Sequence, residues 1–233
     1  MLRRARAAGV AHLLTVGVDQ ATSAAAVQLA ARRRGLRAAV GIHPNRLTGV
    51  EPAAALAWLE QLASAPGVVA VGEVGLDESS SASLVEQLGY FEGCLDLAAR
   101  RGLAVALHVV GLHDATLESL SRAPGPPMIV HYFQGDGALA ERYLARGCVI
   151  SVGRPVTRAE NAALRAAVQA APLDRLLLET DTYPLPGRTT EPRDVADVCR
   201  AVAELKGLSY NEVARTTTGT YLRLVGDNRA TSA

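Results

Sequence analysis

The chain has 233 residues, of which 49% are hydrophobic and 20% are charged. This length and composition exclude wholesale disorder and allow one sizeable buried core, so we expect a single domain over residues 1–233. The 24 basic and 23 acidic side chains leave a formal net charge of +1, which argues against a protein that holds nucleic acid by charge alone.

The sequence shows no sign of a membrane segment or of disulfide bonds. It contains no run of about eighteen apolar residues, so we expect no transmembrane helix and no membrane partner. The basic opening Met1–Arg4 is not followed by an apolar stretch long enough for a signal peptide. Cys94, Cys148 and Cys199 lie far apart without a CxxC pair, which is typical of buried free thiols. We therefore expect a cytoplasmic protein.

The predicted elements alternate along the chain. Residues 2–8 have the pattern of the tail of an amphipathic helix that Gly9 closes. Seven short runs follow that are apolar almost throughout, as expected for strands of a parallel sheet covered by helices on both faces. These runs are 12–18, 38–42, 68–73, 104–108, 128–131, 149–152 and 176–179. Helical patterns occupy 21–34, 53–65, 84–101, 114–122, 138–146, 159–171, 195–206 and 210–224. The stretch 182–191 is rich in Pro and Gly and is predicted to be an active-face loop.

This alternation predicts an α/β protein, with either an open doubly wound sheet or a barrel. A closed (β/α) barrel needs eight strands, whereas this chain has seven strand candidates and opens in a helix. The count therefore favours a TIM-type (β/α) barrel that lacks its first strand. We expect an open seam between the strands that end near Val18 and Glu179.

Five of the seven runs end in, or pass directly into, a side chain that can bind a metal or a proton. The carboxyl ends of parallel strands in a barrel converge on one face, so these side chains are expected to converge as well. Imidazole and carboxylate groups are the ligands of zinc, manganese and iron in hydrolytic sites. The residues are His43, Glu73, His108, His131, Glu179 and Asp181.

Each of these residues also has a structural interpretation. A lone histidine at a strand end is more often a hydrogen-bonded structural residue, but His108 and His131 share their pattern with two carboxylates, which favours ligation. Glu73 could cap a turn, yet a carboxylate that ends a buried strand is costly to desolvate unless it is paired or metal-bound. Asp181 could be an N-cap or turn residue. For Glu179, one step deeper in its strand, we favour a structural or orienting role.

Four motifs in this chain resemble the successive signatures of the TatD family of metal-dependent hydrolases. They are GIHP at 41–44, GEVGLD at 72–77, HYF at 131–133 and LLETD at 177–181. The order and spacing match over nearly the whole chain. The resemblance implies a TIM-barrel deoxyribonuclease with two divalent metal ions (Mg²⁺, Mn²⁺ or Zn²⁺) that acts on DNA ends or related phosphodiesters. Because the net charge is near zero, bound metal ions would supply much of the local positive charge.

The same resemblance assigns roles to individual residues. Glu73 would bridge the two metals, and His108 and His131 would bind one of them. Asp181 would bind the other metal and act as the base, so Asp181 and Glu73 are the predicted catalytic residues. We assign His43 to substrate binding. In this mechanism one metal lowers the pKa of a water molecule and the pair holds the attacking and leaving oxygens.

The chain departs from the family pattern in three places. The family opens with Asp-x-His-x-His, and no such motif exists here. We therefore expect the chain to be N-terminally incomplete, through a late start, a truncation or true degeneration, and to hold at most one divalent ion well. Val110 and Gly111 stand where the family usually has Arg and Asp, and 78–81 replaces a Tyr-Tyr-Arg cluster, so phosphate contacts are lost. Two alternatives stay open: a barrel hydrolase of a small amide, ester or lactone, and a catalytically degraded binding protein.

Overall fold

The computed structural model describes residues 1–122, 125–181 and 184–226. By their mutual contacts the residues form two compact units. The first unit is Leu14–Val130, and the second unit joins Met1–Leu13 to the residues from His131 onward.

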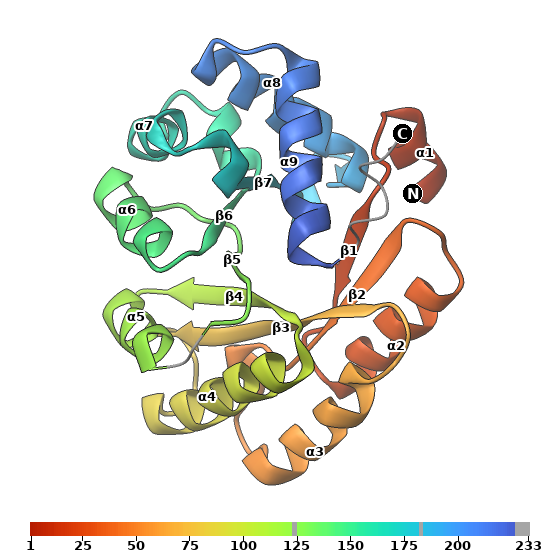
Figure 1. The fold of residues 1–233 in the computed structure, drawn as a ribbon, viewed down its shortest axis with the longest axis vertical. Coiled ribbons are helices and arrows are strands. Elements are labelled where there is room, and N and C mark those ends of the chain that lie inside the picture. The colour runs from red at the N-terminus through yellow and green to blue at the C-terminus, as the bar shows by residue number, and fades with distance from the viewer. Residues whose placement is uncertain (123–124, 182–183, 227–233) are drawn as a thin grey trace. The chain divides into compact units, whose positions relative to one another are not determined.

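The first unit is built from parallel strands with helices between them. Its strands are β1 (Leu13–Val16, of which Leu13 belongs to the second unit), β2 (Leu36–Val40), β3 (Val68–Asp77), β4 (Ala104–Val110) and β5 (Met128–Val130). Its helices are α2 (Gln20–Ala31), the short η1 (Pro44–Arg46), α3 (Pro52–Ala63), α4 (Leu84–Arg101) and α5 (His113–Arg122), and the α-helices lie outside the strands (Figure 1). The strands from β2 to β5 pair in parallel, each with the next along the chain.

The interior of this sheet contains a layer of small side chains. Ala39 pairs with Ala70 in the register of β2 and β3, and Ala70 pairs with Ala104 in the register of β3 and β4. All three are buried and form a cluster against which Leu14 packs. Helix α4 packs against β3, and its Phe91 is fully buried. Burial on both sides explains why the strand runs are apolar almost throughout.

Helix α4 begins and ends where its sequence predicts. Ser83 and Glu86 form a reciprocal capping box at its start. Gly102 ends it in the left-handed conformation, with φ of +64°. The predicted range 84–101 is therefore confirmed.

Strand β3 is longer than predicted, and its glycines explain the difference. The prediction ended the strand at Glu73, whereas β3 continues to Asp77. The register of β3 with β4 shifts between Val71 and Val74, after which Gly75 pairs with His108. Gly75 has φ of +148°, and a Cβ there would collide with the backbone of His108. Glycine at this position allows β3 to run close beside β4 up to Asp77.

The second unit carries the remaining strands and helices. Strands β6 (Val149–Val152) and β7 (Leu176–Leu178) pair in parallel. Helices α6 (Gly137–Ala145), α7 (Ala162–Ala170), α8 (Val195–Lys206) and α9 (Tyr210–Leu224) pack in sequence, each against the next. Helix α1 (Leu2–Ala7) and the short helices η2 (Arg154–Thr157), η3 (Leu173–Arg175) and η4 (Pro192–Asp194) complete the unit. Each of the predicted strands and helices has a counterpart in the structure, which confirms the α/β prediction.

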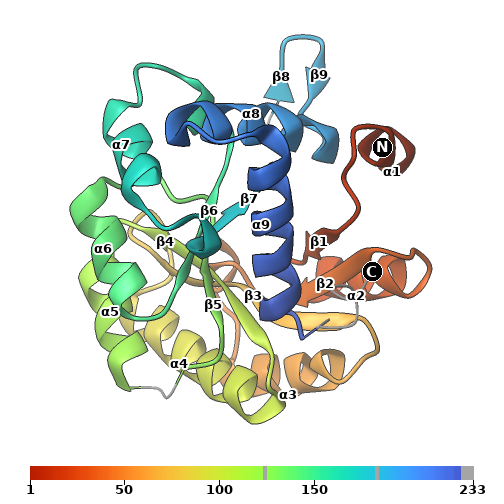
Figure 2. The ribbon, with the colours of Figure 1, turned by 45° about the horizontal axis from the view of Figure 1, so that its top comes forward.

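The stretch predicted as a loop contains regular structure. Strands β8 (Pro184–Leu185) and β9 (Arg188–Thr189) form a short antiparallel hairpin near the start of α8 (Figure 2). Residues 182–183 of the same stretch lie outside the described residues. The hairpin leads into η4, where Glu191 accepts two hydrogen bonds from Arg4 of α1, at 2.6 and 2.8 Å. Among the helices described, none is long and apolar enough to cross a membrane.

Candidate active site

Four polar side chains lie together at the carboxyl ends of β2, β3 and β4 in the first unit. We call His43, Glu73, Asp77 and His108 the first cluster. Glu73 and Asp77 come from β3, His108 comes from β4, and His43 follows β2 as the residue that caps η1. The cluster unites three of the predicted site residues with Asp77, for which no role was predicted.

Carboxylates lie against both nitrogens of the His108 ring. Nδ1 lies 2.8 Å from Oε1 of Glu73, and Nε2 lies 2.9 Å from Oδ2 of Asp77. Burial lowers the pKa of His108, but the hydrogen bonds and charges of Glu73 and Asp77 outweigh burial and raise it above the usual value. The site therefore favours a positive charge at the ring.

Asp77 is held in place from several sides. Its side chain is 5% exposed and accepts hydrogen bonds from the backbone N–H and the hydroxyl of Ser79, at 2.8 and 2.6 Å. Burial raises the pKa of Asp77, but the bonds from Ser79 and His108 outweigh burial and lower it. Gln87 of α4 bonds both the backbone N–H and the carbonyl of Asp77, at 2.8 and 3.1 Å. The carboxylate is thus ionised and fixed where it can accept the Nε2 proton of His108.

This arrangement passes a chemical test for a cation site. If Asp77 accepts the Nε2 proton, Nδ1 of His108 carries a lone pair and faces the Glu73 carboxylate at 2.8 Å. Two acceptors at that distance repel each other unless a proton or a metal ion lies between them. A histidine whose other nitrogen is held by a carboxylate is the usual arrangement around a metal. Glu73 and His108 therefore fit a divalent cation, and Asp77 fits the role of orienting His108.

His43 admits two interpretations. Its Nε2 lies 3.1 Å from Nδ1 of His108 and 3.8 Å from Oε1 of Glu73, and His43, Asp77 and His108 place one ligand atom each within 4.8 Å of one another, as a metal site requires. However, the backbone N–H of Asn45 donates to Nδ1 of His43 at 3.1 Å. The neutral ring then carries its proton on Nε2 and acts as a donor. We favour the donor role, because it keeps the Asn45 bond.

Three further polar residues lie together in the second unit, and we call His131, Glu179 and Asp181 the second cluster. Nδ1 of His131 lies 2.8 Å from Oε2 of Glu179, while its Nε2 lies 4.0 Å from Oδ2 of Asp181. Glu179 also accepts the backbone N–H of Tyr132 at 2.7 Å. Glu179 thus orients His131 as Asp77 orients His108, and the Nε2 of His131 lies on the side of Asp181.

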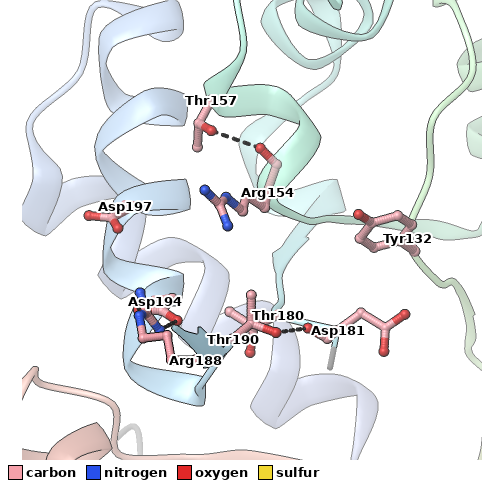
Figure 3. A pocket seen from close by; sticks show the side chains of 9 residues that line it. All are labelled: Tyr132, Arg154, Thr157, Thr180, Asp181, Arg188, Thr190, Asp194 and Asp197. Atoms are coloured by element: carbon pink, nitrogen blue, oxygen red, sulfur yellow. Dashed lines mark hydrogen bonds and ion pairs between the residues drawn. The ribbon is translucent and has the colours of Figure 1, made fainter. Parts of the chain in front are cut away.

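Asp181 lies on the wall of a pocket of about 300 Å³ in the second unit (Figure 3). Its backbone carbonyl accepts a hydrogen bond from the Thr190 hydroxyl, and its carboxylate is 43% exposed. The lining residues are Tyr132, Arg154, Thr157, Thr180, Asp181, Arg188, Thr190, Asp194 and Asp197. A partly exposed carboxylate on a pocket wall can meet a ligand without losing all of its hydration.

No role was predicted for Asp77, although the sequence contains a signal that points to it. The rule that picked the other residues, a polar side chain at the end of an apolar run, also selects Asp77 once β3 is extended through 74–77. The glycines at 72 and 75 concealed the true strand end. The residue itself was visible in the GEVGLD motif.

Parallel strands joined by helices, with imidazole and carboxylate groups at the strand ends, are the features of hydrolases that use a (β/α) barrel to hold metal ions. The comparisons with known proteins define the family. A family model described as TatD related DNase matches residues 1–226. This chain belongs to the TatD family.

Proteins with similar sequences match this chain over most of their length. The chain is 34% identical over 239 residues to an uncharacterized metal-dependent hydrolase TatD from Mycobacterium tuberculosis, covering 97% of this chain and 90% of that protein. It is 35% identical over 221 residues to a protein from Erwinia billingiae named 3'-5' ssDNA/RNA exonuclease TatD, covering 89% of this chain and 84% of that protein. The predictions of the family and of a hydrolase are confirmed.

Solved structures give the same fold. YjjV, a TatD homologue from Escherichia coli, is 31% identical with a TM-score of 0.90, and the match covers 97% of this chain and 90% of that one. An uncharacterized amidohydrolase from Saccharomyces cerevisiae, at 19% identity, shares the fold with a TM-score of 0.82, covering 96% of this chain and 91% of that one. The predicted fold class, a (β/α) barrel type, is confirmed, with seven parallel strands in the main sheet of the described residues.

Proposed function

We propose that this TatD-family hydrolase cleaves phosphodiester bonds at the 3′ end of single-stranded DNA or RNA, using a divalent cation. The observation that carries the proposal is the pairing of each predicted histidine ligand with a carboxylate on its other nitrogen. Asp77 pairs with His108, and Glu179 pairs with His131. The name of the Erwinia billingiae relative supports the choice of substrate.

Four side chains are proposed as metal ligands: Glu73, His108, His131 and Asp181. Mixed imidazole and carboxylate ligands suit Mn²⁺ or Zn²⁺ better than Mg²⁺, which prefers oxygen alone. When bound, the cation would act as a Lewis acid on the phosphoryl group and lower the pKa of a water molecule. The number of ions per chain stays a prediction of at most one, which metal analysis of the purified protein would check.

The protein side chains have separate tasks in this reaction. The exposed carboxylate of Asp181 can accept the proton of the attacking water, which is the role of a general base. Glu179 and Asp77 hold the two histidine rings, so that the ligand atoms do not have to reorganise during turnover. The Nε2–H of His43 can donate to a phosphate oxygen, which supports the predicted role of His43 in substrate binding. The cysteines described as free are all buried, which supports our proposal of a cytoplasmic enzyme.

The test is the release of nucleotides from single-stranded DNA, single-stranded RNA and duplex DNA, with Mn²⁺, Mg²⁺ or a chelator. We expect release from single strands only with the metal, and a loss of at least about a hundredfold in kcat for Asp181→Asn. The matched control is Asp174→Asn, because Asp174 is an exposed carboxylate of the same unit, outside the pocket. Metal-independent release, or an Asp181→Asn variant as active as the control, would contradict the proposal. Asp181-dependent turnover of a small ester or amide, with no nuclease activity, would replace it.

A further inference from the structure

The pocket beside Asp181 contains one arginine that forms no ion pair within the part of the chain that the structure describes. Arg188 donates two hydrogen bonds to Asp194, at 2.7 and 3.1 Å, so its charge is neutralised. Asp197 is paired with Arg200, one helical turn away on α8. In contrast, Arg154 makes no ion pair with any carboxylate of the residues that the structure describes. The guanidinium of Arg154 is therefore available for an anionic ligand.

The backbone of Arg154 is firmly held. It is the first residue of η2, separated from β6 only by Gly153, and its carbonyl accepts a hydrogen bond from the Thr157 hydroxyl at 2.9 Å. Pro155 and Val156 are buried and anchor the turn. The Arg154 side chain is half-buried, so its charge has lost part of its hydration. An anion in the pocket would replace the lost hydration of the guanidinium. A guanidinium can donate two parallel hydrogen bonds to the oxygens of one phosphate.

An aromatic ring lies on the wall of the same pocket. Tyr132 packs against Gly153, where a Cβ would come within 2.6 Å of the ring carbon Cε2. The bond from Tyr132 N–H to Glu179 holds its backbone, which has φ of +47°. In Figure 3, Tyr132 and Asp181 are at one end of the pocket, Asp197 is at the other, and Arg154 is between them. Aromatic side chains bind unpaired bases of any sequence by stacking.

We infer that this pocket is the binding site for the terminal nucleotide of a single strand, with Arg154 binding its phosphate and Tyr132 stacking on its base. The inference rests on the proposed function and specifies which part of the substrate the site takes. A volume of about 300 Å³ is at the lower end of small-molecule pockets, so it suits one nucleotide better than a base pair.

The experiment measures nucleotide binding without catalysis. Wild-type protein, Arg154→Ala, Arg154→Lys and Tyr132→Leu are titrated calorimetrically, in chelator, with 2′-deoxyadenosine 5′-monophosphate, 2′-deoxyadenosine and inorganic phosphate. Arg158→Ala is the matched control, because Arg158 is an exposed arginine just after η2 and outside the pocket. Thermal unfolding of each variant confirms that it is folded. In parallel, kcat and KM are measured on a single-stranded oligonucleotide with Mn²⁺.

We expect Arg154→Ala to weaken binding of the monophosphate by roughly tenfold or more, and Arg158→Ala by less than about twofold. Arg154→Lys should retain an intermediate affinity, because lysine keeps the charge and loses the fork. Tyr132→Leu should weaken both the monophosphate and the nucleoside. On the oligonucleotide, Arg154→Ala should raise KM more than it lowers kcat.

The outcomes separate this inference from the proposed function. If wild-type protein cleaves single strands but Arg154→Ala binds the monophosphate as tightly as Arg158→Ala does, the inference is wrong and the function stands. If no variant cleaves but binding depends on Arg154 and Tyr132, the pocket assignment holds and the nuclease proposal fails. If inorganic phosphate binds as tightly as the monophosphate, and Tyr132→Leu changes nothing, the site is a phosphate site only and the nucleotide assignment is overturned.

Discussion

Single side chains decide the protonation of both predicted histidine ligands. Asp77 lies 2.9 Å from Nε2 of His108, and Glu179 lies 2.8 Å from Nδ1 of His131. When a cation replaces the proton on the other nitrogen of each ring, that nitrogen offers its lone pair beside a second carboxylate, Glu73 for His108 and Asp181 for His131. The two acids can tune metal affinity without touching the metal, because they fix the tautomer and the direction of the ring.

Glu179→Gln tests this orienting role. Glutamine keeps an oxygen that can accept the Tyr132 N–H, but it holds His131 less strongly because it carries no negative charge. We expect affinity for Mn²⁺ or Zn²⁺ to fall by roughly 10- to 100-fold, with kcat reduced at metal concentrations below saturation. Metal titration followed by calorimetry measures the affinity, and excess metal should restore much of the activity.

The control for Glu179→Gln is Glu204→Gln, which changes an exposed glutamate of the same unit. This variant should bind metal as the wild type does. A Glu179→Gln protein with unchanged affinity would show that Glu179 serves only the backbone of Tyr132. A protein that no longer folds would show as a loss of cooperative unfolding, and metal affinity would then be compared in Glu179→Asp instead.

Among the elements, β3 contributes most to the site, because it carries Glu73 and Asp77. Its close approach to β4 depends on glycine at position 75, since a Cβ there would meet the carbonyl oxygen of His108. The same contact sets the register that places His108 opposite Gly75. The absence of a Cβ at Gly75 therefore determines both the path of β3 and the position of His108 in the site.

Gly75→Ala should destabilise the protein by more than about 2 kcal/mol, because it combines a backbone collision with a φ that alanine disfavours. Urea unfolding measures the change in the free energy of unfolding. The comparison variant is Gly89→Ala in helix α4, where a Cβ meets nothing within 4 Å. That variant should stabilise the protein by about 0.5–1 kcal/mol, because alanine is the better helix former. Equal stability of the two variants would refute the role given to Gly75.

At the scale of the whole molecule, each of the three thiols lies in a buried environment. Cys94, Cys148 and Cys199 are free and buried. Burial raises the pKa of Cys94 to about 12, and it raises the pKa of Cys148 to about 12 as well. Burial also raises the pKa of Cys199. Their thiolate forms are therefore scarce at neutral pH, which fits packing residues and not nucleophiles.

We expect a thiol-specific reagent at pH 8 to modify the folded protein far more slowly than the protein in guanidinium chloride, where three thiols per chain react. At a pKa of about 12, roughly one thiol in ten thousand is ionised at that pH. Because the folded pKa values are raised, the stability contributed by these thiols is complete below about pH 9 and is lost as the pH rises toward about 12. Rapid modification of one thiol in the folded protein would contradict this picture.

That residues 1–233 form a single domain stays a prediction, which rests on chain length and composition. A single domain is expected to unfold in one cooperative transition. Calorimetry of the intact chain distinguishes one transition from two.

The sequence by itself determined the class of fold, most elements and most of the residues proposed for the site. Strands that are buried on both sides appear in the sequence as apolar runs. Helix ends appear as glycine residues, as at Gly102 after α4. Both signals depend on neighbouring residues of the chain, so the sequence shows them directly. The strand-end rule found His43, Glu73, His108, His131 and Asp181 for the same reason, since a polar group ending an apolar run needs a partner.

Only the tertiary structure decided which partner each of these residues has. The strand-end rule found Glu179, but it could not show that the Glu179 carboxylate contacts Nδ1 of His131 and not a metal ion. It overlooked Asp77, because Gly75 looks like the end of a strand until the backbone of β4 is seen beside it. It could not distinguish Arg154 from Arg188, since the pairing of Arg188 with Asp194 depends on the path of the hairpin into η4. Charge, spacing and polarity are properties of the chain, whereas a tautomer or an uncompensated charge is a property of neighbours that folding brings together.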